Sequence, residues 1–215
     1  MDRLLATMAE GAVFPMRRPA GGQPPEIWTT LLTGVPPQIH RVATVDEEML
    51  PGVATPIRKG SAPLPLSAAL GFVLPVRKMP ATGVHRSVRT LWEIAGLKQA
   101  SASVGWWASW PAQENPAGGY VVTDRVLPKL LSEVPGDRDT APEALYARLA
   151  EDHAGDAEER TAGYRRWFGD LPVGEETGRL LRESYIIDRF ALSTIATLME
   201  DPEVRAAFVY LPGLD

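Results

Sequence analysis

Cysteine is absent from this 215-residue sequence. Its absence excludes disulfides, thiolate metal sites and cysteine nucleophiles, but it does not decide the compartment. No apolar run reaches the roughly 18 residues that a transmembrane helix needs. The first residues also lack the apolar core of a signal peptide. These features favour a cytoplasmic protein with no membrane segment, and they leave the oligomeric state open.

Positive charge is also in short supply. The formal net charge is −5, which gives no electrostatic case for a nucleic-acid-binding surface. Histidine occurs only at positions 40, 85 and 153, and none of the three has the H-x-x-x-H spacing of a metal site. The sequence contains neither a nucleophile elbow nor a Walker-type phosphate loop. The common catalytic motifs therefore assign no function.

The composition is that of a folded domain. Hydrophobic residues make up 45% of the chain and charged residues 23%, as in ordinary globular proteins. A helix is predicted over 86–97, where apolar residues recur at helical spacing, and a strand over 101–107. Helix followed by strand is the repeating unit of a parallel sheet. We therefore predict one α/β domain spanning 1–215, with a mostly parallel sheet flanked by helices.

Other segments fill in this prediction. Residues 26–32 fit a strand or a short helix, and 206–211 have the pattern of a buried strand. Thr140, followed three residues later by Glu143, matches a capping box, so a helix is predicted from 140 to about 153. Further predicted elements are a helix over 2–10, a strand over 12–16, and helices over 66–75, 154–168 and 176–200. The charged stretch 137–175 is typical of a solvated helical face.

Asp215 lies just beyond the predicted strand 206–211. Ligands of open α/β sheets bind at the carboxyl ends of strands, and carboxylates there commonly bind zinc and hard metal ions. Asp215 is therefore a candidate metal ligand. The alternative is an ordinary exposed aspartate.

Three stretches resemble one family when they are read together. The first is 27–40 (IWTTLLTGVPPQIH). The second is 104–112 (VGWWASWPA), followed by 119–125 (GYVVTDR). The third is 208–215 (FVYLPGLD). In this order they resemble blocks of the alkaline phosphatase superfamily, in its type I phosphodiesterase/nucleotide pyrophosphatase branch.

The resemblance implies an alkaline phosphatase-like α/β/α sandwich that hydrolyses phosphate mono- or diesters of small molecules. For the charged stretch 137–175 it implies a helical cap insertion over the active site, with the solvated helical face as the alternative. It also implies two divalent metal ions, usually zinc or else manganese, and a Thr or Ser nucleophile that forms a covalent intermediate. Asp215 would be one metal ligand. The remaining ligands of the family would lie before and after this sequence, so the resemblance predicts an incomplete domain, a fragment of a longer hydrolase.

One departure concerns the nucleophile. Pro24 stands where the family places it, and proline has no nucleophilic group. Thr29 and Thr30 are the nearest hydroxyls, so both are candidate catalytic residues, with a structural role beside a core tryptophan as the alternative. A shifted register and a lost nucleophile remain open. A lost nucleophile would make the chain a non-catalytic binding or interaction domain of the same fold.

The remaining candidates have structural alternatives. The three histidines are interpreted as surface or hydrogen-bonded structural residues rather than metal ligands. Trp106, Trp107 and Trp110 could form a wall facing a substrate, although aromatic residues of this size more often belong to a core.

Overall fold

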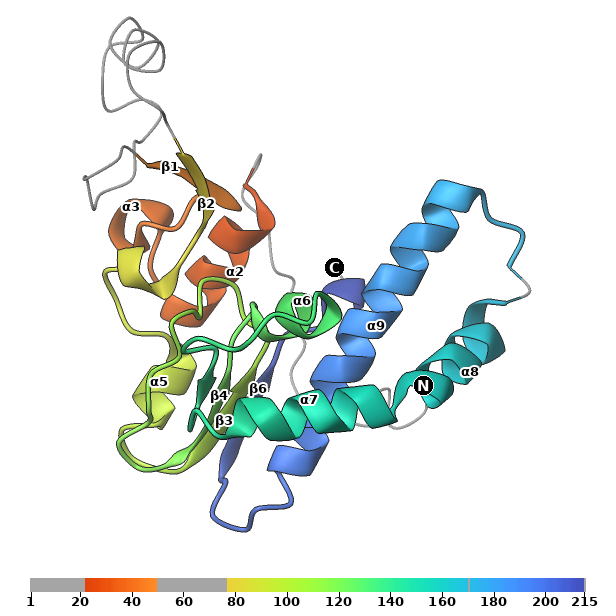
Figure 1. Cartoon of the computed structure of the whole chain (residues 1–215). Helices are drawn as coiled ribbons and strands as arrows, with labels where there is room; N and C mark the ends of the chain where they lie inside the picture. Colours follow the sequence, from red (N-terminus) through yellow and green to blue (C-terminus); the bar gives the residue numbers. More distant parts are fainter. Residues whose placement is uncertain (1–21, 50–76, 170, 215) are drawn as a thin grey trace, which may run out of the picture.

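The structure is a computed structural model that describes residues 22–49, 77–169 and 171–214 (Figure 1). The predicted elements over 2–10, 12–16 and 66–75 lie outside the described residues, as does Asp215. No helix in the described part is long and apolar enough to cross a membrane.

A four-stranded sheet forms the centre of the fold. Its strands are β3 (Ser101–Val104), β4 (Gly119–Val122), β5 (Thr140–Ala141) and β6 (Ala206–Val209). They lie in the order β5-β4-β3-β6. β3 runs parallel to both β4 and β6, and only β5 is antiparallel to its neighbour. The prediction of an α/β domain with a mostly parallel sheet is therefore confirmed.

Each strand sends alternate side chains to opposite faces of the sheet. On β6 and the residues after it, Val209 packs on one face, whereas Phe208 and Tyr210 pack on the other. The two faces differ in chemistry, and we name them the aliphatic face and the aromatic face.

The aliphatic face is covered by α6 (Val126–Leu131), α7 (Leu145–Gly155) and α9 (Glu175–Leu198). Its core holds one aromatic residue, Phe190, among small and branched side chains. The other buried members are Ala102, Val104, Val122, Val126, Leu127, Leu145, Leu149, Ala191, Ile195 and Leu198. Such a set fills space without polar atoms and binds the three helices to the sheet.

The aromatic face is covered by α2 (Pro24–Thr33) and α5 (Leu91–Ala95). Here the packing is dominated by indole and phenol rings. The members are Trp28, Leu32, Trp92, Trp106, Trp107, Phe208 and Tyr210. The Trp92 and Trp106 rings stack with centroids 6.0 Å apart.

The smaller elements lie at the periphery. β1 (Asp46–Met49) and β2 (Arg77–Pro80) form an antiparallel ribbon. Figure 1 shows this ribbon beside α2 and α3 (Pro37–His40), whereas α8 (Ala157–Phe168) stands apart beside the N-terminal half of α9. Two short 3-10 turns complete the fold, η1 (Gly83–His85) and η2 (Pro212–Leu214).

The helix predicted over 86–97 is wrong in length, because α5 begins only at Leu91. Glu93 Oε2 accepts a hydrogen bond from the backbone N–H of Thr90 at 2.6 Å. This contact belongs to a capping box, which makes Thr90 the residue directly before the helix. Arg86 precedes the helix and binds both carboxylate oxygens of Glu93 at 2.6 Å. An ion pair, rather than a further helical turn, therefore holds the upstream residues.

The capping box predicted at Thr140 is also wrong. Thr140 lies in β5, and α7 begins at Leu145. Pro142 explains the difference, because a residue before proline disfavours helical backbone. The Thr140 hydroxyl instead hydrogen-bonds the carbonyl oxygens of Pro142 and Glu143, at 3.1 and 3.2 Å.

For three other segments the structure shows a conformation or packing that the residue pattern did not decide. Residues 26–32 are helical, within α2, and Pro24 and Pro25 occupy the first turn, where a missing N–H costs nothing. β6 is only half-buried because it lies at the edge of the described sheet. In α8, Tyr164 and Phe168 pack against Tyr185, whereas Trp167 is 71% exposed.

Within the range interpreted as a cap, 137–175, β5 belongs to the sheet and α7 belongs to the aliphatic core. Only α8 and the residues after it stand away from the sheet (Figure 1). A cap role for this part of the range stays a prediction.

Candidate functional site at the carboxyl edge of the sheet

The carboxyl ends of β3, β4 and β6 lie at one edge of the sheet, because the three strands run parallel. α2 reaches the same edge through Trp28, whose ring centroid lies 6.2 Å from Trp106 after β3 and 5.2 Å from Tyr210 after β6. Trp106 and Tyr210 are themselves 5.6 Å apart. Side chains from the stretches 27–40, 104–112 and 208–215 therefore meet in one aromatic cluster.

Ser109 and Asp124 form a polar pair at this edge, after β3 and β4. The Ser109 hydroxyl donates to Asp124 Oδ1 at 3.1 Å, and the backbone N–H of Asp124 donates to Ser109 Oγ at 3.0 Å. Burial raises the pKa of Asp124 to about 6, although the hydrogen bond from Ser109 opposes the shift. A carboxyl group with such a pKa can hold or release a proton close to neutral pH.

Arg125 places a positive charge beside this pair. Its guanidinium carbon lies 4.0 Å from the centroid of the Trp110 ring, a close cation–π contact. Trp110 is held in place because its Nε1–H donates to the Asp137 carbonyl at 2.9 Å. Nε and Nη2 of Arg125 are buried and have no hydrogen-bond partner in the described structure. Guanidinium N–H groups in this condition suit a carboxylate or phosphate oxygen.

Asp124 and Arg125 lie in the stretch 119–125, whose pattern predicts no role for either residue. One signal points to Asp124, because it follows β4 closely, as Asp215 follows the predicted strand 206–211. The pairing with Ser109, fifteen residues away in sequence, has no local signal, because it depends on the neighbouring register of β3 and β4.

Thr30 lies on α2 and is fully engaged. Its hydroxyl donates to the Glu26 carbonyl at 2.8 Å and contacts His40 Nε2 at 2.9 Å. His40 Nδ1 accepts the backbone N–H of Val42 at 3.1 Å, so the ring proton is on Nε2 and is donated to Thr30. His40 therefore cannot remove the Thr30 proton in this tautomer.

His40 is fully buried. Burial, together with the charge of Arg86, lowers the pKa of His40 to about 4. The ring is thus neutral over the physiological range and connects α3 to α2. This is the structural role expected for His40 from sequence.

Thr29 is 2% exposed, and its hydroxyl has no partner among the described residues. Asp215 lies outside the described residues. The preceding turn, η2, is held where the Gly213 backbone N–H donates to Asp188 Oδ1 at 3.0 Å. A nucleophilic role for Thr29 or Thr30, and a metal-binding role for Asp215, stay predictions.

The metal-ligand chemistry of the described residues does not fit a two-metal centre. They contain no cluster of three or more His, Asp or Glu side chains that could hold a metal ion. All three histidines are engaged elsewhere: His40 as above, His85 with Glu47 and Thr82, and His153 with Arg160. Outside the described residues the sequence offers only carboxylates, namely Asp2, Glu10, Asp170 and Asp215.

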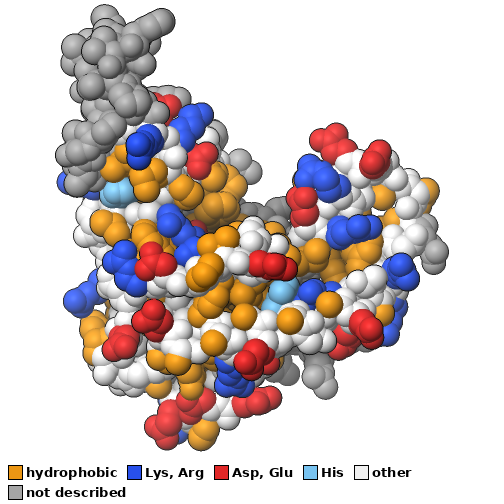
Figure 2. Space-filling view, in the orientation of Figure 1, with side chains coloured by type: hydrophobic (Ala, Val, Ile, Leu, Met, Phe, Trp, Pro, Cys, Tyr) orange, Lys and Arg blue, Asp and Glu red, His pale blue; other side chains and the backbone are white. Residues whose placement is uncertain are grey.

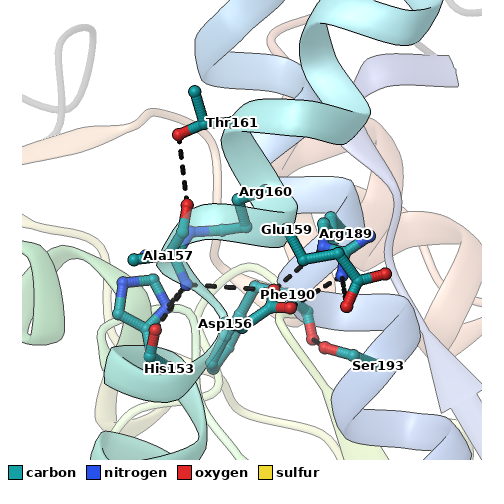
Figure 3. Close-up of polar contacts among 9 residues, drawn as sticks. All are labelled: His153, Asp156, Ala157, Glu159, Arg160, Thr161, Arg189, Phe190 and Ser193. Atoms are coloured by element: carbon teal, nitrogen blue, oxygen red, sulfur yellow. Dashed lines mark hydrogen bonds and ion pairs between the residues drawn. The ribbon is translucent and has the colours of Figure 1, made fainter.

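A second polar cluster joins α7, α8 and α9 (Figure 3). Arg189 of α9 donates from Nε and Nη2 to both carboxylate oxygens of Asp156, at 2.9 and 2.7 Å. These hydrogen bonds hold the pKa of Asp156 below its usual value. Arg160 donates to the His153 carbonyl and lies beside the His153 ring.

A pocket of about 520 Å³ adjoins this second cluster. Its wall mixes both signs of charge, with Arg148 and Arg160 near Glu151, Asp152 and Asp156. The most buried charges of this second cluster already neutralise one another. The cluster therefore holds α7, α8 and α9 together.

Comparison of the chain with protein-family models, with curated proteins and with solved structures finds no match. The resemblance to the alkaline phosphatase superfamily therefore rests on the three sequence stretches alone and stays a prediction.

Proposed function

We propose that this chain is part of a metal-dependent phosphate-ester hydrolase of the alkaline phosphatase superfamily, with the sandwich fold of that family. The observation that carries the proposal is the aromatic cluster at the carboxyl edge. It brings together side chains from stretches 27–40, 104–112 and 208–215, which are far apart in sequence. Ligands of parallel α/β sheets bind at this edge.

The residues around the cluster support an anionic substrate. The unpartnered N–H groups of Arg125 would donate to a phosphoryl oxygen, and stacking on Trp110 fixes the guanidinium plane. Asp124 would exchange a proton near neutral pH, held in position by Ser109. The substrate class is a small-molecule phosphate mono- or diester.

Two divalent ions, zinc or manganese, would supply Lewis-acid stabilisation of the phosphoryl and leaving oxygens when bound. The described residues do not provide a donor set for such a pair. Their ligands would have to come from outside the described residues, with Asp215 as one candidate.

A second candidate is a non-catalytic alkaline phosphatase-like domain that binds phosphate esters or a protein partner without turnover. Two observations favour it. Pro24 occupies the expected nucleophile position in the first turn of α2, and the described residues contain no group of three or more His, Asp or Glu side chains that could hold a metal ion.

The proposal is tested first by sequencing the encoding DNA on both sides of this reading frame. The hydrolase predicts a strand ending in Asp upstream and a His three residues after Asp215. The whole product is then assayed with bis(p-nitrophenyl) phosphate in zinc or manganese. Metal-dependent turnover that falls in Arg125→Gln supports the hydrolase, and ester binding without turnover supports the second candidate.

The 215-residue chain assayed by itself is expected to give no turnover above the metal-only blank. Absence of both turnover and phosphate-ester binding in the whole product would overturn the proposed function. Metal-dependent turnover by the 215-residue chain alone would overturn the argument from the donor set.

A further inference from the structure

A second pocket, of about 630 Å³, lies between α8 and α9 and extends to the end of α6. We name it the α8–α9 groove. Figure 2 shows hydrophobic surface in the hollow between these two helices, with Lys or Arg side chains at its rim. Its lining residues are Leu131, Ala157, Arg160, Thr161, Tyr164, Arg165, Phe168, Gly169, Leu171, Val173, Arg182 and Ile186. The volume is in the range of small-molecule sites.

The apolar part of the groove is preformed. The Tyr164 and Phe168 rings lie 5.4 Å apart, and the Tyr164 hydroxyl donates to the Gly178 carbonyl at 3.1 Å, which fixes its orientation across the groove. Leu131, Leu171 and Val173 are 57%, 47% and 40% exposed. Leucine and valine side chains left open beside fixed rings form a surface that an apolar body can cover.

The charged residues among the described lining residues have one sign. Arginine occurs three times among them, whereas aspartate and glutamate do not occur. Arg160 is already committed, because it donates to the His153 carbonyl and lies 3.9 Å from Asp156. Arg165 and Arg182 have no ion pair within the described residues. The Arg182 guanidinium rests over the Tyr164 ring, with its carbon 5.2 Å from the centroid.

We propose that the α8–α9 groove binds an amphipathic phosphate monoester, with its apolar body on Tyr164 and Phe168 and its phosphate at Arg165 and Arg182. A phosphate monoester carries close to two negative charges near neutral pH, which the two unpaired arginines balance. Guanidinium groups bind phosphate oxygens in pairs of parallel hydrogen bonds. The site is separate from the carboxyl-edge pair of Ser109 and Asp124, and the inference does not rest on the proposed function.

The test is calorimetric titration of the 215-residue chain with dodecyl phosphate below its critical micelle concentration. Saturable binding of one molecule per chain is expected. Inorganic phosphate, which lacks the apolar body, and dodecanol, which lacks the charge, are each expected to bind at least tenfold more weakly. Loss of a charge-assisted hydrogen bond is worth roughly 1.5–3 kcal/mol, so Arg165→Gln and Arg182→Gln are each expected to weaken binding about tenfold or more.

Arg166→Gln is the matched control, since Arg166 neighbours Arg165 on α8 but does not line the groove. It should leave the affinity for dodecyl phosphate unchanged. Thermal melts of all three variants verify that each is folded, and Phe168→Ala provides an independent change on the apolar side.

Several outcomes would overturn the proposal. They are equal affinity for inorganic phosphate and dodecyl phosphate, equal losses in Arg166→Gln and Arg165→Gln, and no effect of Phe168→Ala. Binding seen only with phosphatidic acid vesicles would assign the surface to a membrane instead. Loss of binding through self-association of the chain would assign the groove to a second copy.

Discussion

The two faces of the sheet are both buried, but they differ in whether their polar side-chain atoms have hydrogen-bond partners. On the aliphatic face the polar tips of partly buried aromatic residues have partners, since the Tyr120 hydroxyl donates to Asp201 and the Tyr146 hydroxyl to the Val134 carbonyl. On the aromatic face, Nε1 of Trp106 and of Trp107 is buried and has no partner within the described residues. The Thr29 hydroxyl, on α2 above this face, is likewise buried and has no partner within the described residues.

The two faces therefore differ in how completely the polar atoms of their aromatic residues are hydrogen-bonded. Buried polar groups in native proteins are nearly always hydrogen-bonded, so each exception calls for a water, a ligand or further polypeptide. The aromatic face adjoins the carboxyl edge, where Arg125 also has unpartnered donors. Several unsatisfied groups, among them Nε1 of Trp106 and of Trp107, therefore lie on the side of the sheet to which the proposed function assigns substrate.

The largest expected effect is on the aromatic face itself. Trp106→Ala should lower the free energy of unfolding by roughly 3–5 kcal/mol, because Trp106 is 8% exposed and packs on three other rings. Trp106→Phe should cost only about 1 kcal/mol, because a ring remains and no hydrogen bond of Nε1 is lost. Urea unfolding measures both. A cost for Trp106→Phe close to that of the alanine variant would mean that Nε1 is bonded after all.

A pH series compares two groups, Asp124 and His40, whose pKa values are shifted in opposite directions. The pKa of Asp124 is raised from 3.8 to about 6, so the native state binds its proton more tightly and stability falls as pH rises through this window. The pKa of His40 is lowered from 6.5 to about 4, so stability rises with pH over nearly the same window. Each shift of about two pKa units corresponds to on the order of 3 kcal/mol.

The two slopes largely cancel in the wild type, and single variants should reveal them. Between pH 4 and pH 6.5, Asp124→Asn should become more stable with rising pH relative to the wild type, and His40→Gln should become less stable. Unfolding free energies at several pH values provide the measurement. Parallel curves for the wild type and both variants would contradict the pKa assignments.

The smallest effect tests the aliphatic face. Tyr146→Phe removes the hydrogen bond to the Val134 carbonyl, 2.7 Å long, and should cost about 1 kcal/mol. Like Trp106→Phe, this change keeps a six-membered ring and removes one polar group, but it leaves the volume of the side chain nearly unchanged. If Tyr146→Phe has no effect, the contrast between the two faces loses half of its support.

Sequence patterns predicted the long elements well. The longest predicted helix, 176–200, appears as α9, with Phe190, Ile195 and Leu198 on its buried side. Its apolar spacing continues over many turns, so errors at single positions average out. Short signals failed more often. Thr140 and Glu143 match a capping box, but Pro142 between them prevents it.

The candidate site was only partly visible in the sequence. Position after a strand predicts a role for Asp215, which lies outside the described residues, and it applies equally to Asp124, which the sequence pattern alone did not single out. Thr29 and Thr30 are predicted only as the hydroxyls nearest to Pro24. The structure brings Thr30 to His40 in a tautomer that donates to it, a detail that depends on the turn at 40–42 and not on spacing.

The sequence by itself determined the class of the fold, because hydrophobic periodicity is a local property that alternates here between helix and strand. It also determined that all histidines fall outside metal-ligand spacings. Only the tertiary structure decided which residues meet: Ser109 with Asp124, Arg125 with Trp110, and Trp28 with Tyr210. The physical reason is register. The parallel alignment of β3 with β4 and β6 places the ends of distant segments together, and no single segment contains that information.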